Sequence, residues 1–109
     1  MAKQHHGAGV RSQRLEELFR EELNSVLDIE VNDPGLEGVR VTRVELSGDG
    51  SRARAWFVVD ALDAHPARAA LERAAGFLRS RLCDALPLKR LPELTFRHDP
   101  AAQLPDQEP

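Results

Sequence analysis

The segment 52–59 constrains the fold of this chain most, because its side chains alternate strictly between two kinds. Successive side chains of a β-strand point to opposite faces. One face of this predicted strand is apolar and consists of Ala53, Ala55, Phe57 and Val59. The opposite face carries Arg52, Arg54, Trp56 and Val58. A sheet with one apolar face has to bury it against a second layer, so we expect helices packed on that side.

A further strand, predicted at 39–46, precedes this one and is joined to it by the turn Gly48-Asp49-Gly50. Its apolar residues lie at positions 39, 41, 44 and 46, so the alternation slips after Val41. An extra residue in one strand of an antiparallel pair forms a β-bulge. We therefore expect a hairpin with a bulge near Thr42-Arg43.

Two amphipathic helices and a last strand complete the predicted domain. The helix over 12–28 has apolar residues at helical intervals, namely Leu15, Leu18, Phe19, Leu23, Val26 and Leu27. The second helix opens between Asp63 and Pro66 and ends before Pro87, and its apolar residues are Ala67, Leu71, Ala74, Leu78, Leu82 and Ala85. In the strand 93–97, Leu94 and Phe96 should face the core. This order predicts an α+β sandwich of two layers with a three-stranded mixed sheet.

The composition of the chain changes on both sides of this domain. Residues 1–10 are mostly small and polar and predict a flexible N-terminal tail, and residues 11–99 form the domain. The proline-rich, acidic residues 100–109 predict a disordered tail. No apolar run approaches the roughly 20 residues of a membrane span, and no signal segment opens the chain. A single cysteine, Cys83, fits a reducing compartment, so we expect a cytoplasmic protein.

Charge is divided unevenly along the chain, although the formal net charge is only -3. Residues 65–98 hold seven basic and three acidic residues, whereas residues 11–64 hold seven basic and twelve acidic ones. A domain with this division can carry a basic face for nucleic acid despite its acidic total. The alternative is an ordinary solvated surface.

The run ERAAGFLRSRL, residues 72–82, places a glycine inside the second predicted helix. Glycine costs roughly 1 kcal/mol there relative to alanine. On a helical wheel Gly76 lies opposite the apolar stripe, so it does not bring the helix closer to the sheet. A break at Ala75-Gly76 would expose the N–H groups of a new helix start, which attracts phosphate. The alternative is a kink that only shapes the helix around the core.

Basic and small residues around this glycine form the predicted RNA-binding site. Small side chains let an RNA backbone approach, and arginines and lysines neutralise its phosphates. The predicted site consists of Arg73, Ala74, Ala75, Gly76, Arg79, Arg81, Lys89 and Arg90.

A secondary candidate lies on the polar face of strand 52–59, where Trp56 follows Arg52 and Arg54. An aromatic ring flanked by arginines can stack on a nucleobase. The alternative, which we favour from the sequence, is that Trp56 covers its cross-strand neighbours.

Motifs of catalysis and metal binding are missing from the sequence. His5 and His6 lie without cysteine or acidic ligands at metal-site spacing. There is no phosphate-binding loop signature, and Ser80, His65 and His98 show no triad spacing. We therefore expect a protein that is not an enzyme and has no cofactor. An alternative is a protein-interaction module that uses the acidic residues Glu16, Glu17, Glu21 and Glu22.

Two segments, DPGLEGVRVTRVELSGDGSRARAWFVV and AAGFLRSRLCDALPLKRLPELTFRHD, resemble the bacterial ribosome-binding factor A family. The resemblance runs from about Arg11 to Asp99. It implies a type II KH-like domain in which an Ala-x-Gly kink, here Ala74-Ala75-Gly76, replaces the glycine-rich loop of KH proteins. Gly35 departs from the family, whose members often have arginine or lysine after the Asp-Pro pair.

The resemblance also implies a function. Family members bind the free 30S small ribosomal subunit and assist late maturation of 16S rRNA, including processing of its 5′ end. They matter most in the cold, and a maturation GTPase is a usual companion in their release. The chain is therefore expected to be a monomer whose partners are the 30S subunit and 16S rRNA, without a membrane or a small-molecule substrate.

Overall fold

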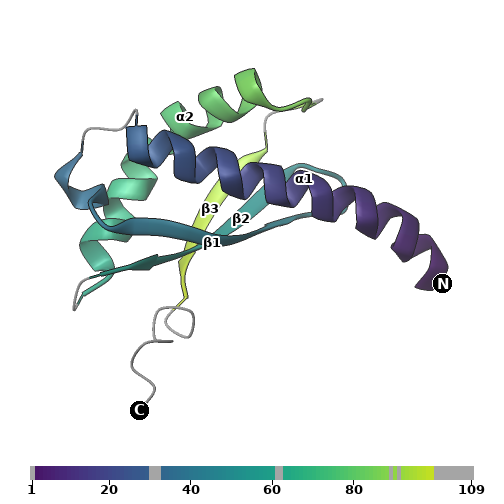
Figure 1. Cartoon of the computed structure of the whole chain (residues 1–109), viewed down its shortest axis with the longest axis horizontal. Coiled ribbons are helices and arrows are strands. Elements are labelled where there is room, and N and C mark those ends of the chain that lie inside the picture. Colours follow the sequence, from purple (N-terminus) through teal and green to yellow (C-terminus); the bar gives the residue numbers. More distant parts are fainter. Residues whose placement is uncertain (1, 30–32, 61–62, 89, 91, 100–109) are drawn as a thin grey trace, which may run out of the picture.

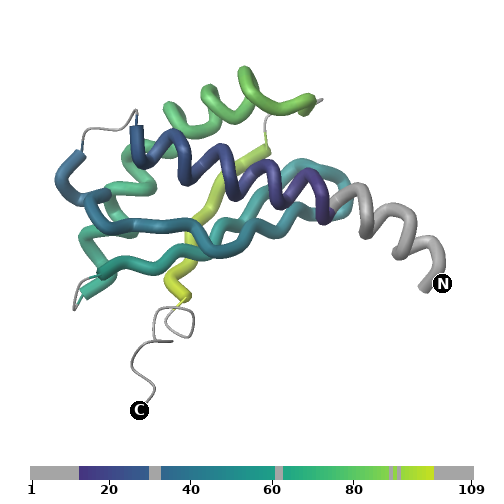
Figure 2. Tube along the Cα trace, viewed as in Figure 1, coloured from purple at the N-terminus to yellow at the C-terminus, as the bar shows by residue number. Residues whose placement is uncertain are grey.

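A computed structural model of the chain describes residues 2–29, 33–60, 63–88, 90 and 92–99, with side chains from residue 13 onward. The elements in order are α1 (Ala2–Ile29), the 3-10 helix η1 (Pro34–Leu36), β1 (Val39–Leu46), β2 (Arg52–Val59), α2 (His65–Ala85) and β3 (Glu93–His98). Figure 1 shows α1 crossing the sheet, and Figure 2 follows the chain through the hairpin of β1 and β2.

The sheet has the order β1-β2-β3 and is mixed, as predicted. β1 pairs antiparallel with β2 across the turn at 48–50, and β2 pairs parallel with β3. The parallel pair is possible because α2 carries the chain back across the sheet between the two strands. Both helices pack against the sheet, α1 against β1 and α2 against β3, which confirms the two-layer α+β sandwich.

Alternate residues of all three strands form the floor of the core. The alternation of β2 is confirmed, since Ala53, Ala55 and Phe57 are fully buried. Leu94 and Phe96 of β3 face the same side. The helices contribute the buried residues Phe19, Leu23, Val26, Leu27, Ala67, Ala70, Leu71, Leu78 and Leu82. Leu18 was predicted for the core but is 39% exposed, because it lies at the edge of the apolar stripe of α1.

The predicted bulge is present in β1. Val41 pairs with Phe57 and Arg43 pairs with Trp56, so β1 has one extra residue, Thr42, that has no partner in the register with β2. The Thr42 hydroxyl donates to the carbonyl of Trp56 at 3.3 Å. A bulge turns the following residues toward the opposite face, which restores Val44 to the core and places Arg43 across from Trp56.

Two side chains of α1 bind the outer edge of β1, a feature that the sequence pattern did not indicate. The buried Asn24 donates to the carbonyl of Val41 at 2.9 Å and accepts from its N–H at 2.8 Å. Glu16 accepts from the N–H of Leu46 at 2.8 Å. Backbone groups of an edge strand otherwise stay open to pairing with another strand. Asn24 and Glu16 therefore fasten the helix to the strand at two points.

Helix boundaries differ from the predicted ones at the N-terminus. α1 begins at Ala2 rather than at residue 12, and no proline interrupts residues 1–10. The division into a tail 1–10 and a domain 11–99 stays a prediction. Residues 100–109, predicted to be disordered, lie outside the described residues.

α2 is one continuous helix from His65 to Ala85. It begins as predicted, with Pro66 in the first turn and the Asp63 carboxylate accepting from the His65 N–H at 3.0 Å. The kink expected at Ala75-Gly76 does not interrupt the helix, so the predicted second helix start with free N–H groups is not formed. The φ of Gly76 is not positive, so the helix passes through it without the left-handed torsion that glycine adopts more readily than other residues.

Candidate nucleic-acid interface

The outward surface of α2 carries the glycine that the sequence analysis placed there. Gly76 is exposed, and a Cβ added to it meets no atom within 4 Å outside its own helix turns. Ala74 and Ala75 are half-buried against the core. Phe77 beside Gly76 is 45% exposed. The surface around Gly76 is therefore open to a partner, and nothing in the packing of the chain requires a glycine.

Arg73 has a partner within the fold. Its guanidinium lies 3.2 Å from the carboxylate of Asp33, forty residues earlier in the chain. Asp33 also accepts from the N–H of Gly35 at 2.9 Å and thereby caps η1. The Gly35 N–H, and then the Arg73 guanidinium, hold the pKa of Asp33 below its ordinary value. Arg73 thus fastens α2 to the turn before β1.

Two more predicted arginines also have partners within the fold. The Nε of Arg79 donates to the carbonyl of Pro92 at 2.9 Å, which ties α2 to the segment before β3. Arg81 forms an ion pair with Asp84 at 3.7 Å, one helical turn away. Arg90 is exposed, and Lys89 lies outside the described residues. Each of the three α2 arginines of the predicted site therefore has a contact within the fold, which a charge count along the chain could not show.

The open face of the sheet brings together basic residues that are far apart in the chain. Within the three strands, all of them described, the exposed residues of this face include five arginines and two glutamates. The arginines are Arg40, Arg43, Arg52, Arg54 and Arg97, and the glutamates are Glu45 and Glu93. Positive charge therefore dominates this face, although the whole chain is acidic.

Trp56 lies at the centre of this face. The guanidinium carbon of Arg43 stands 3.9 Å from the centroid of the Trp56 ring, and that of Arg54 stands 5.6 Å from it. Arg97 is the pairing partner of Trp56 on β3. Arg52 and Arg54 were the neighbours expected from the sequence, but Arg43 makes the closest stack. The cross-strand neighbour Arg43 thus covers the Trp56 ring, and whether Trp56 contacts RNA or only packs against its neighbours stays a prediction.

A hollow lies beside this cluster. Its lining includes Arg52, Arg54, Arg68 and Arg97 together with Glu45 and Thr95. Arg54 and Glu45 are 4.0 Å apart and both are about half exposed, so their attraction is weak in water. The hollow therefore offers several guanidinium groups to an anion.

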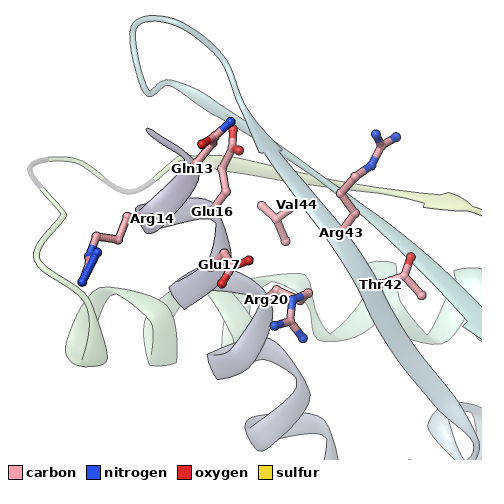
Figure 3. Close-up of a pocket in the computed structure, with 8 residues that line it drawn as sticks. All are labelled: Gln13, Arg14, Glu16, Glu17, Arg20, Thr42, Arg43 and Val44. Carbon is pink, nitrogen blue, oxygen red and sulfur yellow. The ribbon is translucent and has the colours of Figure 1, made fainter. Parts of the chain in front are cut away.

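A groove between α1 and β1 has a different character (Figure 3). It is lined by Gln13, Arg14, Glu16, Glu17, Arg20, Thr42, Arg43 and Val44. Figure 3 shows Val44 directed toward α1 and Arg43 directed away from it. Acidic and basic groups are mixed here, and Glu16 is already bound to Leu46. This groove therefore lacks the single sign of charge that attracts nucleic acid or a strongly basic protein.

Other classes of site find little support in the described part of the chain. It holds no cluster of three or more His, Cys, Asp or Glu side chains that could bind a metal ion. None of its helices has the length and apolar character that crossing a membrane requires. Cys83 is exposed on α2.

Comparison with known proteins identifies the family. A family model described as Ribosome-binding factor A matches residues 11–105. Ribosome-binding factor A from Heliobacterium modesticaldum is 40% identical over 94 residues, which cover 84% of this chain and 78% of the relative. The protein of that name from Pediococcus pentosaceus is 34% identical over 100 residues, covering 89% of this chain and 86% of the relative.

Solved structures agree with these relatives. The crystal structure of ribosome-binding factor A from Thermus thermophilus has a TM-score of 0.75 at 29% identity, over 80% of this chain and 93% of that one. A homology model of the Thermus thermophilus factor, fitted into a cryo-EM map of a 30S complex, has a TM-score of 0.70 at 29% identity, over 83% and 97% of the two chains. This chain belongs to the ribosome-binding factor A family.

Proposed function

We propose that this chain is a non-enzymatic assembly factor that binds the free 30S ribosomal subunit. The observation that carries the proposal is its membership of a family of which a Thermus thermophilus relative has been fitted into the map of a 30S complex. Together with the domain similarity over most of both chains, this supports the same binding partner for this chain.

The proposal extends to the role that the family resemblance implies. The chain assists late maturation of 16S rRNA, including processing of its 5′ end, and is needed most in the cold. It acts in the cytoplasm as a monomer, and a maturation GTPase takes part in its release. No catalytic step is assigned to its own residues.

The outer surface of α2 is the proposed contact with rRNA. Gly76 leaves room for a nucleic-acid backbone, because the space beside it is empty. Ala74 and Ala75 keep the surface low, while Arg73, Arg79, Arg81, Lys89 and Arg90 supply positive charge around it. Phosphate contacts position a protein on RNA without reading its sequence, so the shape of the rRNA sets the specificity.

A salt titration with purified 30S subunits tests this contact. The double variant Lys89→Glu/Arg90→Glu reverses two positive charges and leaves the contacts of Arg73 and Arg79 intact. Binding weakens, and the plot of log affinity against log salt loses about 0.7 to 0.9 of slope for each lost phosphate contact. Arg14→Glu/Arg20→Glu is the matched control, because it changes the net charge equally on α1. Equal binding and equal slopes for both variants would reject this surface.

A further inference from the structure

We propose that the open face of the sheet is a second RNA site, which holds an unpaired stretch of RNA with one base stacked on the Arg43–Trp56 pair. The inference rests on the proposed function, since it assigns a second contact to the same RNA-binding protein. The site is formed by β1, β2 and β3, on the side of the sheet that α1 and α2 leave open.

The stacked pair is the first reason. The guanidinium carbon of the exposed Arg43 lies 3.9 Å from the centroid of the half-buried Trp56 ring. The indole ring therefore supports the guanidinium from the side of the sheet. The planar guanidinium is attracted to the indole face, and its other face is available to a further planar group. Nucleobases stack readily on arginine planes and on aromatic rings, whatever their sequence. The pair is thus a platform for one base.

The charge around the platform is the second reason. Arg52, Arg54 and Arg97 line the neighbouring hollow on strands β2 and β3. Their side chains are exposed, and the paired strands β2 and β3 fix the positions of their Cα atoms. An unpaired strand whose base rests on Arg43 and Trp56 would place its neighbouring phosphates along these arginines. Glu45, 4.0 Å from Arg54, is displaced easily because that pair is exposed to water.

The composition of the face favours RNA over a protein partner. Among the described residues the exposed large apolar side chains are Leu18, Ile29 and Phe77, all of them outside the sheet. A protein interface usually has a fully buried apolar core, for which this face offers no exposed large apolar side chain. One aromatic ring among five arginines suits a stacked base flanked by phosphates better.

Trp56 also provides the measurement, because it is the one tryptophan in the sequence. We suggest titrating the full chain with a fluorescein-labelled single-stranded RNA of 12 or so mixed nucleotides, following anisotropy and tryptophan emission together. Single-stranded RNA should quench Trp56 as it binds, and a blunt duplex of the same sequence should quench it much less. Arg43→Gln should lower the affinity for the single strand roughly fivefold or more, the lower range for a lost stacking contact.

The charged part of the site is tested with Arg54→Gln/Arg97→Gln. Both side chains are exposed, so the variant is expected to fold, and a thermal melt verifies this. Its salt slope for the single strand should be smaller by about 1.4, which corresponds to two phosphate contacts. Arg14→Gln/Arg20→Gln, which changes the net charge equally, should keep the affinity and slope of the unchanged chain.

The outcomes separate this inference from the proposed function. The sheet site would be overturned if single-stranded RNA does not bind. It would also be overturned if the RNA binds without quenching Trp56 and with the same affinity for Arg43→Gln and for Arg54→Gln/Arg97→Gln as for the unchanged chain. The sheet site would also be overturned if ribosomal proteins free of RNA quench the emission of Trp56 and single-stranded RNA does not. If the unchanged chain nevertheless pellets with 30S subunits, the proposed function stands without this site. Failure to pellet with 30S subunits would reject the proposed function itself.

Discussion

Gly35 and Ala70 touch where η1 meets α2. A Cβ added at Gly35 would stand 2.9 Å from the Cβ of Ala70 and 3.5 Å from the carbonyl of Pro66. The φ of Gly35 is negative, so packing rather than backbone conformation requires the glycine. A side chain at position 35 would therefore press on Ala70, because the turn approaches α2 closely here.

Replacement of Gly35 by alanine is predicted to destabilise the protein. The added methyl overpacks the contact with Ala70, which costs about 1 to 3 kcal/mol of unfolding free energy. Urea unfolding measures the loss. Gly48→Ala is the control, since its Cβ meets nothing within 4 Å and its φ is not positive. Equal stability of Gly35→Ala and Gly48→Ala would contradict the packing seen here.

Asp49 gives the hairpin turn a dependence on pH. Its carboxylate accepts from the N–H and hydroxyl of Ser51 at 3.0 and 2.7 Å and from the hydroxyl of Ser47 at 2.9 Å. These bonds, that of the Ser51 N–H first, hold the pKa of Asp49 far below its ordinary value. A lowered folded-state pKa stabilises the fold above the unfolded-state pKa of about 3.9, and the gain is lost as the pH falls through the folded value.

Asp49→Asn should therefore unfold more readily than the unchanged chain at pH 7, because the neutral amide is a weaker acceptor. The difference in stability should shrink progressively below about pH 4, where the carboxylate begins to be protonated in the unfolded state while the folded state keeps it charged. Urea midpoints at pH 7, 4 and 2.5 follow this change. A difference that stays constant across these values would show that the charge of Asp49 does not stabilise the turn.

At the scale of elements, α1 depends on the edge of β1 as much as on the core. Asn24 satisfies both polar groups of Val41, and it is the one polar residue among the buried side chains described. An amide side chain suits this place because it donates and accepts at once. The contact fixes where the helix lies along the strand.

Asn24→Ala should lower the unfolding free energy by about 3 kcal/mol, since it leaves a buried N–H and a buried carbonyl without partners. Urea unfolding measures the total, and amide hydrogen exchange at Val41 reports the local opening. Ser25→Ala, exposed on the next position of α1, should have little effect. Unaltered exchange at Val41 would mean that other groups protect this edge.

Replacement of Gly76 is predicted to have opposite effects on the stability of α2 and on binding to the 30S subunit. The helix runs through it and a Cβ meets nothing, so Gly76→Ala should stabilise the protein by about 1 kcal/mol. If RNA approaches the backbone here, the same change should weaken 30S binding. Thermal unfolding and pelleting with 30S subunits test the two effects, with Ser25→Ala as a helix control. Higher stability with unchanged binding would remove Gly76 from the RNA contact.

At the scale of the whole molecule, the spacing of apolar residues predicted the two layers. It could not predict contacts between residues that lie far apart in the sequence. The strict alternation of apolar residues in β2 was enough to predict the buried face of the sheet. The slip of this alternation in β1 was enough to predict the bulge. The pair of Arg73 with Asp33 and the bond of Arg79 to Pro92 join residues 40 and 13 positions apart, which no local pattern encodes. The Arg43–Trp56 stack was missed because the bulge shifts the register that brings them together.

The molecule as a whole presents two basic surfaces on an acidic chain. The outer surface of α2 surrounds Gly76, and the open face of the sheet surrounds Trp56. The groove between α1 and β1 is lined by both acidic and basic residues and is not a third basic surface. The two proposed RNA contacts would explain how a chain with a net charge of -3 can bind a polyanion, since local fields rather than the total charge guide association.

Sedimentation of a lysate from cells that carry a tagged copy of the chain tests the central claim most directly. On a sucrose gradient that separates free subunits from whole ribosomes, the tagged chain should migrate with free 30S subunits and be absent from the fractions of whole ribosomes. It should leave the 30S fractions when the gradient salt is raised, because phosphate contacts weaken. Migration only at the top of the gradient, at low salt as well, would contradict a role on the small subunit.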